Sequence, residues 1–124
     1  MANSNITKEK AEKIWESYYG TQTRVKDFAG RTMNKSAFNN RKSAFGWNIH
    51  HVKPISLNGS NDIENTIPVH ILSNSEFGDK NSAKVNGTFY QWQKMPGKRT
   101  AGIIYELGED VILSPNKKFI KNKK

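Results

Sequence analysis

The apolar residues of this 124-residue chain are scattered in runs of only a few residues. A helix that crosses a membrane needs roughly 20 consecutive apolar residues, so the sequence predicts no such helix and no membrane partner. Short apolar runs instead suit short strands and one-sided helices around a modest core. We therefore expect a soluble cytoplasmic protein that folds as a single domain over residues 1–124.

Charge and cysteine usage limit the possible functions. Twenty Lys and Arg against eleven Asp and Glu give a net charge of +9, and basic residues are concentrated in a tail at residues 116–124. This excess favours nucleic acid as a partner, with an anionic membrane surface second and a solubility role for the tail third. The chain has no cysteine, so disulfides and thiolate sites are excluded, and any metal needs N and O ligands.

The N-terminal part predicts one amphipathic helix over residues 7–19. Its apolar side chains recur at the spacing of one helical face: Ala11, Ile14, Trp15 and Tyr18. Thr7 is a suitable N-cap and Gly20 a stop signal. We expect this face to pack against the rest of the domain. A short hairpin over residues 23–33 and a basic connector with a helical turn over residues 35–45 follow.

The middle of the chain is expected to form a strand, a long turn, a second strand and a helix. The strands are predicted at residues 47–53 and 66–69, with turn formers at residues 58–62 between them. Residues 70–77 predict a helix of about two turns that ends at Gly78.

The C-terminal third predicts a small antiparallel sheet. The Asn-Gly pair at residues 86–87 is a hairpin signal between residues 84–85 and 88–94. Two further strands are expected at residues 101–107 and 111–113. Together with the N-terminal helix, these strands predict an α+β fold.

Two adjacent histidines end the first strand of the middle segment. Imidazole suits both metal ligation and proton abstraction near neutral pH, so His50 and His51 could divide these tasks. Asn65 lies 14 positions after His51, and Asn74 lies nine positions after Asn65. Neighbouring side chains of a strand point to opposite faces, so the histidines could share one site only if the strand bends or bulges.

This region resembles the HNH endonucleases. The matching segments are WNIHHVKP at 47–54, Gly59, NDIEN at 61–65 and HILSN at 70–74. The resemblance covers residues 46–80 closely and residues 27–47 more loosely. It implies a ββα-metal core, here with an N-terminal helix and a C-terminal antiparallel sheet added. It also implies a metal-dependent DNA endonuclease that hydrolyses phosphodiester bonds by nicking or by double-strand cleavage.

The resemblance also implies residue roles. His51 matches the general base, and His50 matches a metal ligand at a position where many relatives have Asp. Asn65 matches the residue that pins the loop and so orients the base. Asn74 matches the helix ligand, which is His in many relatives but Asn in the HNH domain of RNA-guided CRISPR nucleases. One divalent cation is implied, Mg²⁺ first and Mn²⁺ second. His70 is a further candidate, as a ligand, a phosphate contact or a structural residue.

Each of these residues also has a structural interpretation. His51 alone would more often be a packed histidine, and His50 alone a surface residue. Asn65 could make a local turn hydrogen bond, and Asn74 could be a solvated helix residue. Their coincidence in one segment favours the site.

Duplex DNA is the expected partner, and a partner protein could supply specificity because no base-reading helix is evident. The candidate phosphate contacts are Arg41, Lys42, Lys53, Lys80, Lys84, Arg99, Lys117, Lys118 and Lys121. A solvated surface position is the alternative for each of them. Two alternative functions remain. One is a catalytically silent HNH-derived module that acts as a DNA-binding or inhibitory protein, and the other is a basic adaptor for a protein or a membrane. Phage, mobile-element, restriction and toxin proteins use this motif, so we expect the cytoplasm of a bacterium or phage-infected host.

Overall fold

The computed structural model describes residues 6–106 and 112–113. Its helices and strands are α1 (Lys8–Tyr19), β1 (Arg24–Lys26), β2 (Thr32–Asn34), β3 (Trp47–His51), β4 (Thr66–His70), α2 (Ile71–Phe77), β5 (Ser82–Val85), β6 (Thr88–Lys94), β7 (Gly102–Glu106) and β8 (Ile112–Leu113). Within the described residues the strands form three antiparallel sheets, β1–β2, β3–β4 and β5–β6–β7–β8. The predicted α+β class is confirmed. No helix in this part of the chain is long and apolar enough to cross a membrane.

Helix α1 forms where its caps and its apolar face predicted it. The hydroxyl of Thr7 accepts a hydrogen bond from the Lys10 amide at 3.1 Å, and the chain leaves the helix at Gly20, where φ is 62°. The indole of Trp15 packs against that of Trp47 on β3, with ring centroids 4.7 Å apart. The apolar face of α1 is therefore a packing surface, as predicted.

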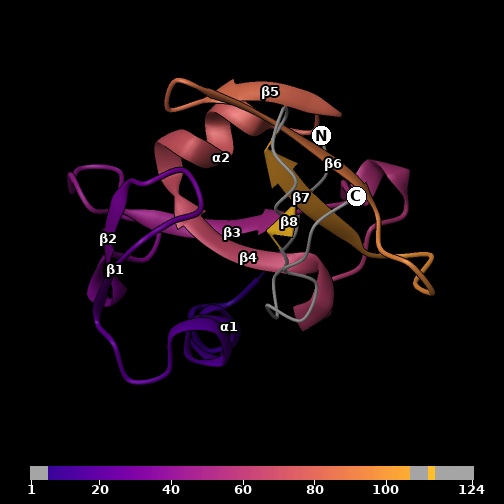
Figure 1. The fold of residues 1–124 in the computed structure, drawn as a ribbon. Helices are drawn as coiled ribbons and strands as arrows, with labels where there is room; N and C mark the ends of the chain where they lie inside the picture. Colours follow the sequence, from indigo (N-terminus) through magenta and orange to yellow (C-terminus); the bar gives the residue numbers. More distant parts are fainter. Residues whose placement is uncertain (1–5, 107–111, 114–124) are drawn as a thin grey trace.

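The β3–β4 hairpin lies between the two helices, with α1 on one side and α2 on the other (Figure 1). The pairing is regular from Trp47 opposite His70 to His51 opposite Thr66. Strand β4 continues directly into α2, with His70 as the cap of the helix. The sheet of β5 to β8 packs on the other side of α2 through a cluster that includes Phe77, Val85, Trp92 and Ile104.

The predicted hairpin turn at Asn86 and Gly87 joins β5 to β6. Asn86 and Gly87 both have positive φ, 50° and 90°, as a tight hairpin turn requires. Strand β7 begins one residue later than predicted, at Gly102. Residues 107 and 111, which the predicted strands also included, lie outside the described residues.

Candidate active site

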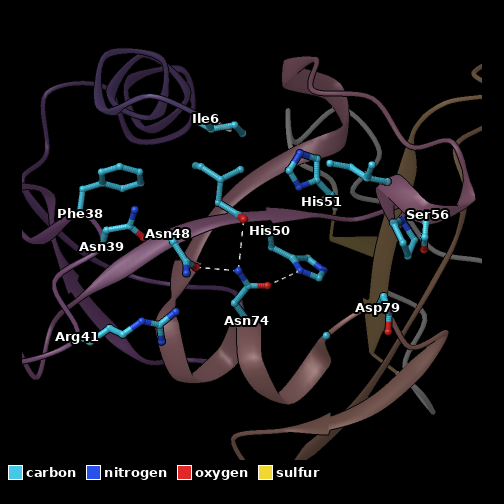
Figure 2. A pocket seen from close by; sticks show the side chains of 14 residues that line it. Ile6, Phe38, Asn39, Arg41, Asn48, His50, His51, Ser56, Asn74 and Asp79 are labelled. Carbon is cyan, nitrogen blue, oxygen red and sulfur yellow. Dashed lines mark hydrogen bonds between the residues drawn. The ribbon is translucent and has the colours of Figure 1, made fainter. Parts of the chain in front are cut away.

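A cavity of about 580 Å³ runs along β3. Strand β4 covers one edge of β3, whereas the other edge carries a single bridge, between Phe38 and Trp47, in the described part of the chain. The cavity therefore reaches side chains from both faces of the strand. Figure 2 shows residues from β3, from the loops on either side of it and from α2 among its lining, including Arg41, Asn48, His50, His51, Asn74 and Asp79.

The two predicted metal ligands are in direct contact. Nδ1 of His50 lies 2.8 Å from Oδ1 of Asn74 (Figure 2). The amide nitrogen of Asn74 donates to the side chain of Asn48 and to the carbonyl of Ile49, which leaves its oxygen facing His50. Nδ1 of His50 must then carry the proton, and Nε2 is an unprotonated nitrogen.

Nε2 of His50 is buried and has no hydrogen-bond partner among the described residues. The ring itself is 5.1 Å from that of Phe77. Burial lowers the pKa of His50 to about 4; the hydrogen bond to Asn74 opposes this shift, and the neighbouring His51 adds to it. The imidazole is therefore neutral at pH 7, which is the form that binds metals.

The side chain of His51 lies on the opposite face of β3 and is half-buried. Its Nε2 is 2.6 Å from Oδ1 of Asn61. Burial lowers the pKa of His51, the hydrogen bond to Asn61 acts against this shift, and the charge of Lys10 lowers the pKa further. This imidazole is also neutral at pH 7, and so able to accept a proton.

Strand β3 carries no bulge at the two histidines. The register is regular from Trp47 to His51, and the two side chains alternate as in any strand. They reach the same cavity because the cavity runs along the sparsely covered edge of β3 and is open to both faces.

Asn65 ties the loop after β3 to two other parts of the fold. It is fully buried, and its side-chain oxygen accepts from the amides of Lys53, at 2.8 Å, and Gly102, at 2.9 Å. Its side-chain nitrogen donates to the carbonyls of Lys53 and Ser60. The loop closes tightly here, because a Cβ on Gly59 would lie 1.7 Å from the carbonyl oxygen of Lys53.

The described residues offer few donor atoms for a metal ion near the cavity. The described residues contain no group of three or more His, Cys, Asp or Glu side chains that could hold a metal ion. The candidate donors are the buried Nε2 of His50 and the carboxylate of Asp79, which lines the same cavity, whereas the oxygen of Asn74 accepts the hydrogen bond from Nδ1 of His50. Few protein ligands and several waters are typical of Mg²⁺, whereas structural zinc requires a closed set of four.

His70 is separate from this group. Its Nδ1 accepts from the amide of Leu72 at 3.0 Å, and its Nε2 lies 2.8 Å from the carbonyl of Ala44, to which it donates. Both ring nitrogens are therefore used to begin α2 and to hold the preceding loop. His70 lines a second cavity of about 450 Å³, away from His50 and His51.

Three residues of the site were missed in the sequence. Asn48 lies two positions before His50, and the strand period of two could have placed it on the same face. Asp79 is not among the predicted site residues, but it lines the cavity just after Gly78. Asn61 carried no local signal, because the path of its loop depends on distant contacts.

The predicted phosphate contacts are dispersed. Arg41 lines the cavity on the side of β3 that faces Asn74 (Figure 2). The ammonium of Lys53 donates to the carbonyl of Arg99, and that of Lys80 donates to the carbonyl of Glu76. Lys42, Lys84 and Arg99 are exposed, and Lys117, Lys118 and Lys121 lie outside the described residues.

Comparisons of the chain with protein-family models, with curated proteins and with solved structures find no match.

Proposed function

We propose that the protein is a metal-dependent DNA endonuclease of the HNH type. One observation carries the proposal: two neutral imidazoles with different environments border one cavity. His50 is buried, is held by Asn74 and has an unpaired nitrogen among the described residues, which suits a metal ligand. His51 is half-buried on the other face of β3, which suits a group that exchanges protons with water.

Phosphodiester hydrolysis needs both kinds of group. The anionic oxygens of the phosphate repel a nucleophile, so charge must be neutralised and water must lose a proton. His51 would take this proton. Its lowered pKa keeps it unprotonated at pH 7, whereas a lysine at this position would be protonated.

His50 and Asn74 would hold the divalent cation. The unprotonated Nε2 of His50 is the available ligand atom, and Asn74 keeps it unprotonated by accepting a hydrogen bond from the N–H at Nδ1. Metal-binding histidines are commonly oriented by such a hydrogen bond from the second ring nitrogen. Bound there, Mg²⁺ or Mn²⁺ would supply positive charge to the phosphate.

The charge of the chain supports DNA as the substrate. The net charge of +9 favours a polyanion, and Arg41 brings a guanidinium to the cavity that contains the two histidines. A guanidinium can contact two phosphate oxygens at once. Arg41 is therefore the most direct candidate for holding the DNA backbone beside the reacting phosphate.

Incubation of the purified protein with supercoiled plasmid, in Mg²⁺, in Mn²⁺ and in EDTA, tests the proposal. We expect relaxed or linear DNA with either metal and none in EDTA. Binding of the plasmid without cleavage under all three conditions would instead identify a silent DNA-binding module. Cleavage that continues in EDTA would contradict a metal-dependent mechanism.

A further inference from the structure

We infer that Asn61 is the positioning residue for His51: its side-chain oxygen accepts a hydrogen bond from the Nε2–H group of His51, which leaves Nδ1 as the atom that takes a proton from water. This inference rests on the proposed function. Asn61 lies in the loop between β3 and β4, and its proposed role differs from that of His50 and Asn74, which would hold the cation.

The contact itself is short and specific. Nε2 of His51 lies 2.6 Å from Oδ1 of Asn61, and Nδ1 forms no hydrogen bond within the described part of the chain. A neutral imidazole carries one proton, and the partner of one nitrogen decides which nitrogen that is. An amide oxygen can only accept, so it selects the tautomer that has a lone pair on Nδ1.

The backbone on both sides of Asn61 is anchored. The Ser60 amide donates to the carbonyl of Thr100 at 2.9 Å, and the Ser60 carbonyl accepts from the side chain of Asn65 at 3.0 Å. The Asp62 carbonyl accepts from the Asn65 amide at 2.9 Å and from the hydroxyl of Thr66 at 3.0 Å. The side chain of Asn61 is thus exposed, while the backbone on either side of it is fixed by hydrogen bonds.

These contacts divide two tasks that the family resemblance assigns to one residue. Asn65 holds the loop and makes no side-chain hydrogen bond to the imidazole, since its four side-chain hydrogen bonds all go to backbone groups. Asn61 touches the imidazole directly and is exposed, so it contributes little to the core. Removal of Asn61 should therefore change His51 and leave the fold intact.

The tautomer of His51 can be measured without any cleavage. Long-range ¹H–¹⁵N correlation spectra of the full-length protein, labelled in histidine and free of metal, distinguish protonated from unprotonated ring nitrogens. The measurement is made at a pH where all three histidines are neutral. His50, protonated at Nδ1, and His70, protonated at Nε2, serve as internal references.

We expect His51 to be protonated at Nε2 in the wild type and in Asn61→Asp, which keeps an acceptor at this position. Asn61→Ala should show a mixture of both tautomers, while His50 and His70 are unchanged. Leu57→Ala, which changes an exposed residue of the same loop, is the control and should match the wild type. A wild-type His51 protonated at Nδ1, or an unchanged His51 in Asn61→Ala, would overturn the inference.

Cleavage kinetics provide the second measurement. Asn61→Ala should lower kcat about tenfold with KM nearly unchanged, since one hydrogen bond to the base is lost, and Asn61→Asp should recover part of it. Normal kcat in Asn61→Ala would count against the inference even if the protein cleaves DNA. Conversely, the expected spectra from a protein that does not cleave would support the positioning contact and refute the proposed function.

Discussion

Nδ1 of His50 donates a hydrogen bond to Oδ1 of Asn74 at 2.8 Å, and this contact joins β3 to α2 beside the cavity. The orientation of the amide is set by the carbonyl of Ile49, which can only accept. The imidazole is therefore held with its unprotonated nitrogen buried, and the strand and the helix are connected by the same two residues that we propose hold the cation.

Removal of either of these side chains should weaken metal binding. In His50→Ala and in Asn74→Ala, the metal concentration for half-maximal cleavage should rise about tenfold or more, because the first loses the ligand atom and the second loses the hydrogen bond that orients it, each an effect of at least ~1.4 kcal/mol. His70→Asn is the matched control: asparagine is also a good helix cap, and His70 lies outside this cavity. Unchanged metal titrations of both variants would show that the cation is bound elsewhere.

The buried His50 should also make the metal-free protein less stable in acid. The pKa of His50 is about 4 in the folded state, against 6.5 for a freely exposed histidine. Between these two values the histidine is protonated in the unfolded chain but not in the folded chain, so acid favours unfolding. The free energy of unfolding in EDTA should fall between pH 6.5 and 4, with up to about 3 kcal/mol of this loss due to His50.

Urea denaturation at neutral pH and near pH 4 measures this effect. In His50→Gln the free energy of unfolding should fall less between neutral pH and pH 4, because the contribution of the histidine is absent. The contributions of the carboxylates should be the same in both proteins. An equal acid loss in the two proteins would mean that His50 titrates normally.

Asn65 and Asn61 should differ sharply in their effect on stability. Asn65→Ala leaves partly buried backbone groups of Lys53 and Ser60 and the buried amide of Gly102 without their side-chain partner, so the free energy of unfolding should drop by about 3 kcal/mol. Asn61→Ala removes an exposed side chain and should change it by less than about 0.5 kcal/mol. Equal effects of the two substitutions on the free energy of unfolding, measured by urea denaturation, would show that Asn65 does not hold the loop more strongly than Asn61.

Arg41 should contribute to DNA binding through its charge. On a log–log plot of affinity against salt, the slope for duplex DNA is near −0.9 per phosphate contacted. Arg41→Ala should reduce the steepness by about one, for all DNA sequences alike, whereas Arg41→Lys keeps the charge and should retain the slope. Fluorescence anisotropy in EDTA measures binding without cleavage, and a slope unchanged by Arg41→Ala would remove this residue from the interface.

The elements of the fold were predictable wherever the determinants are local. Helix α1 follows from the Thr7 cap and a stripe of apolar side chains within one segment. The β5–β6 hairpin follows from two adjacent residues with positive φ, Asn86 and Gly87. Strand β3, strand β4 and helix α2 also lie close to their predicted ranges, with His70 as the cap of α2 instead of its first residue.

The environment of the site was less predictable because it depends on distant contacts. Asn61 reaches His51 through a loop that Asn65 holds partly by bonding to Gly102, 37 residues further along the chain. The two histidines share a cavity without a bulge because the free edge of β3 is sparsely covered, a property of the sheet that no local pattern encodes.

The role of His51 can be measured from the rate of plasmid cleavage by His51→Ala. His51 is the proposed base, and a positioned base commonly contributes roughly 10²- to 10⁴-fold to the rate. With Mg²⁺ in excess we predict a loss of this size in His51→Ala, with unchanged DNA affinity and a thermal unfolding transition close to that of the wild type, while His70→Asn cleaves at the wild-type rate. Cleavage by a folded His51→Ala protein at nearly the wild-type rate would show that His51 is not the general base.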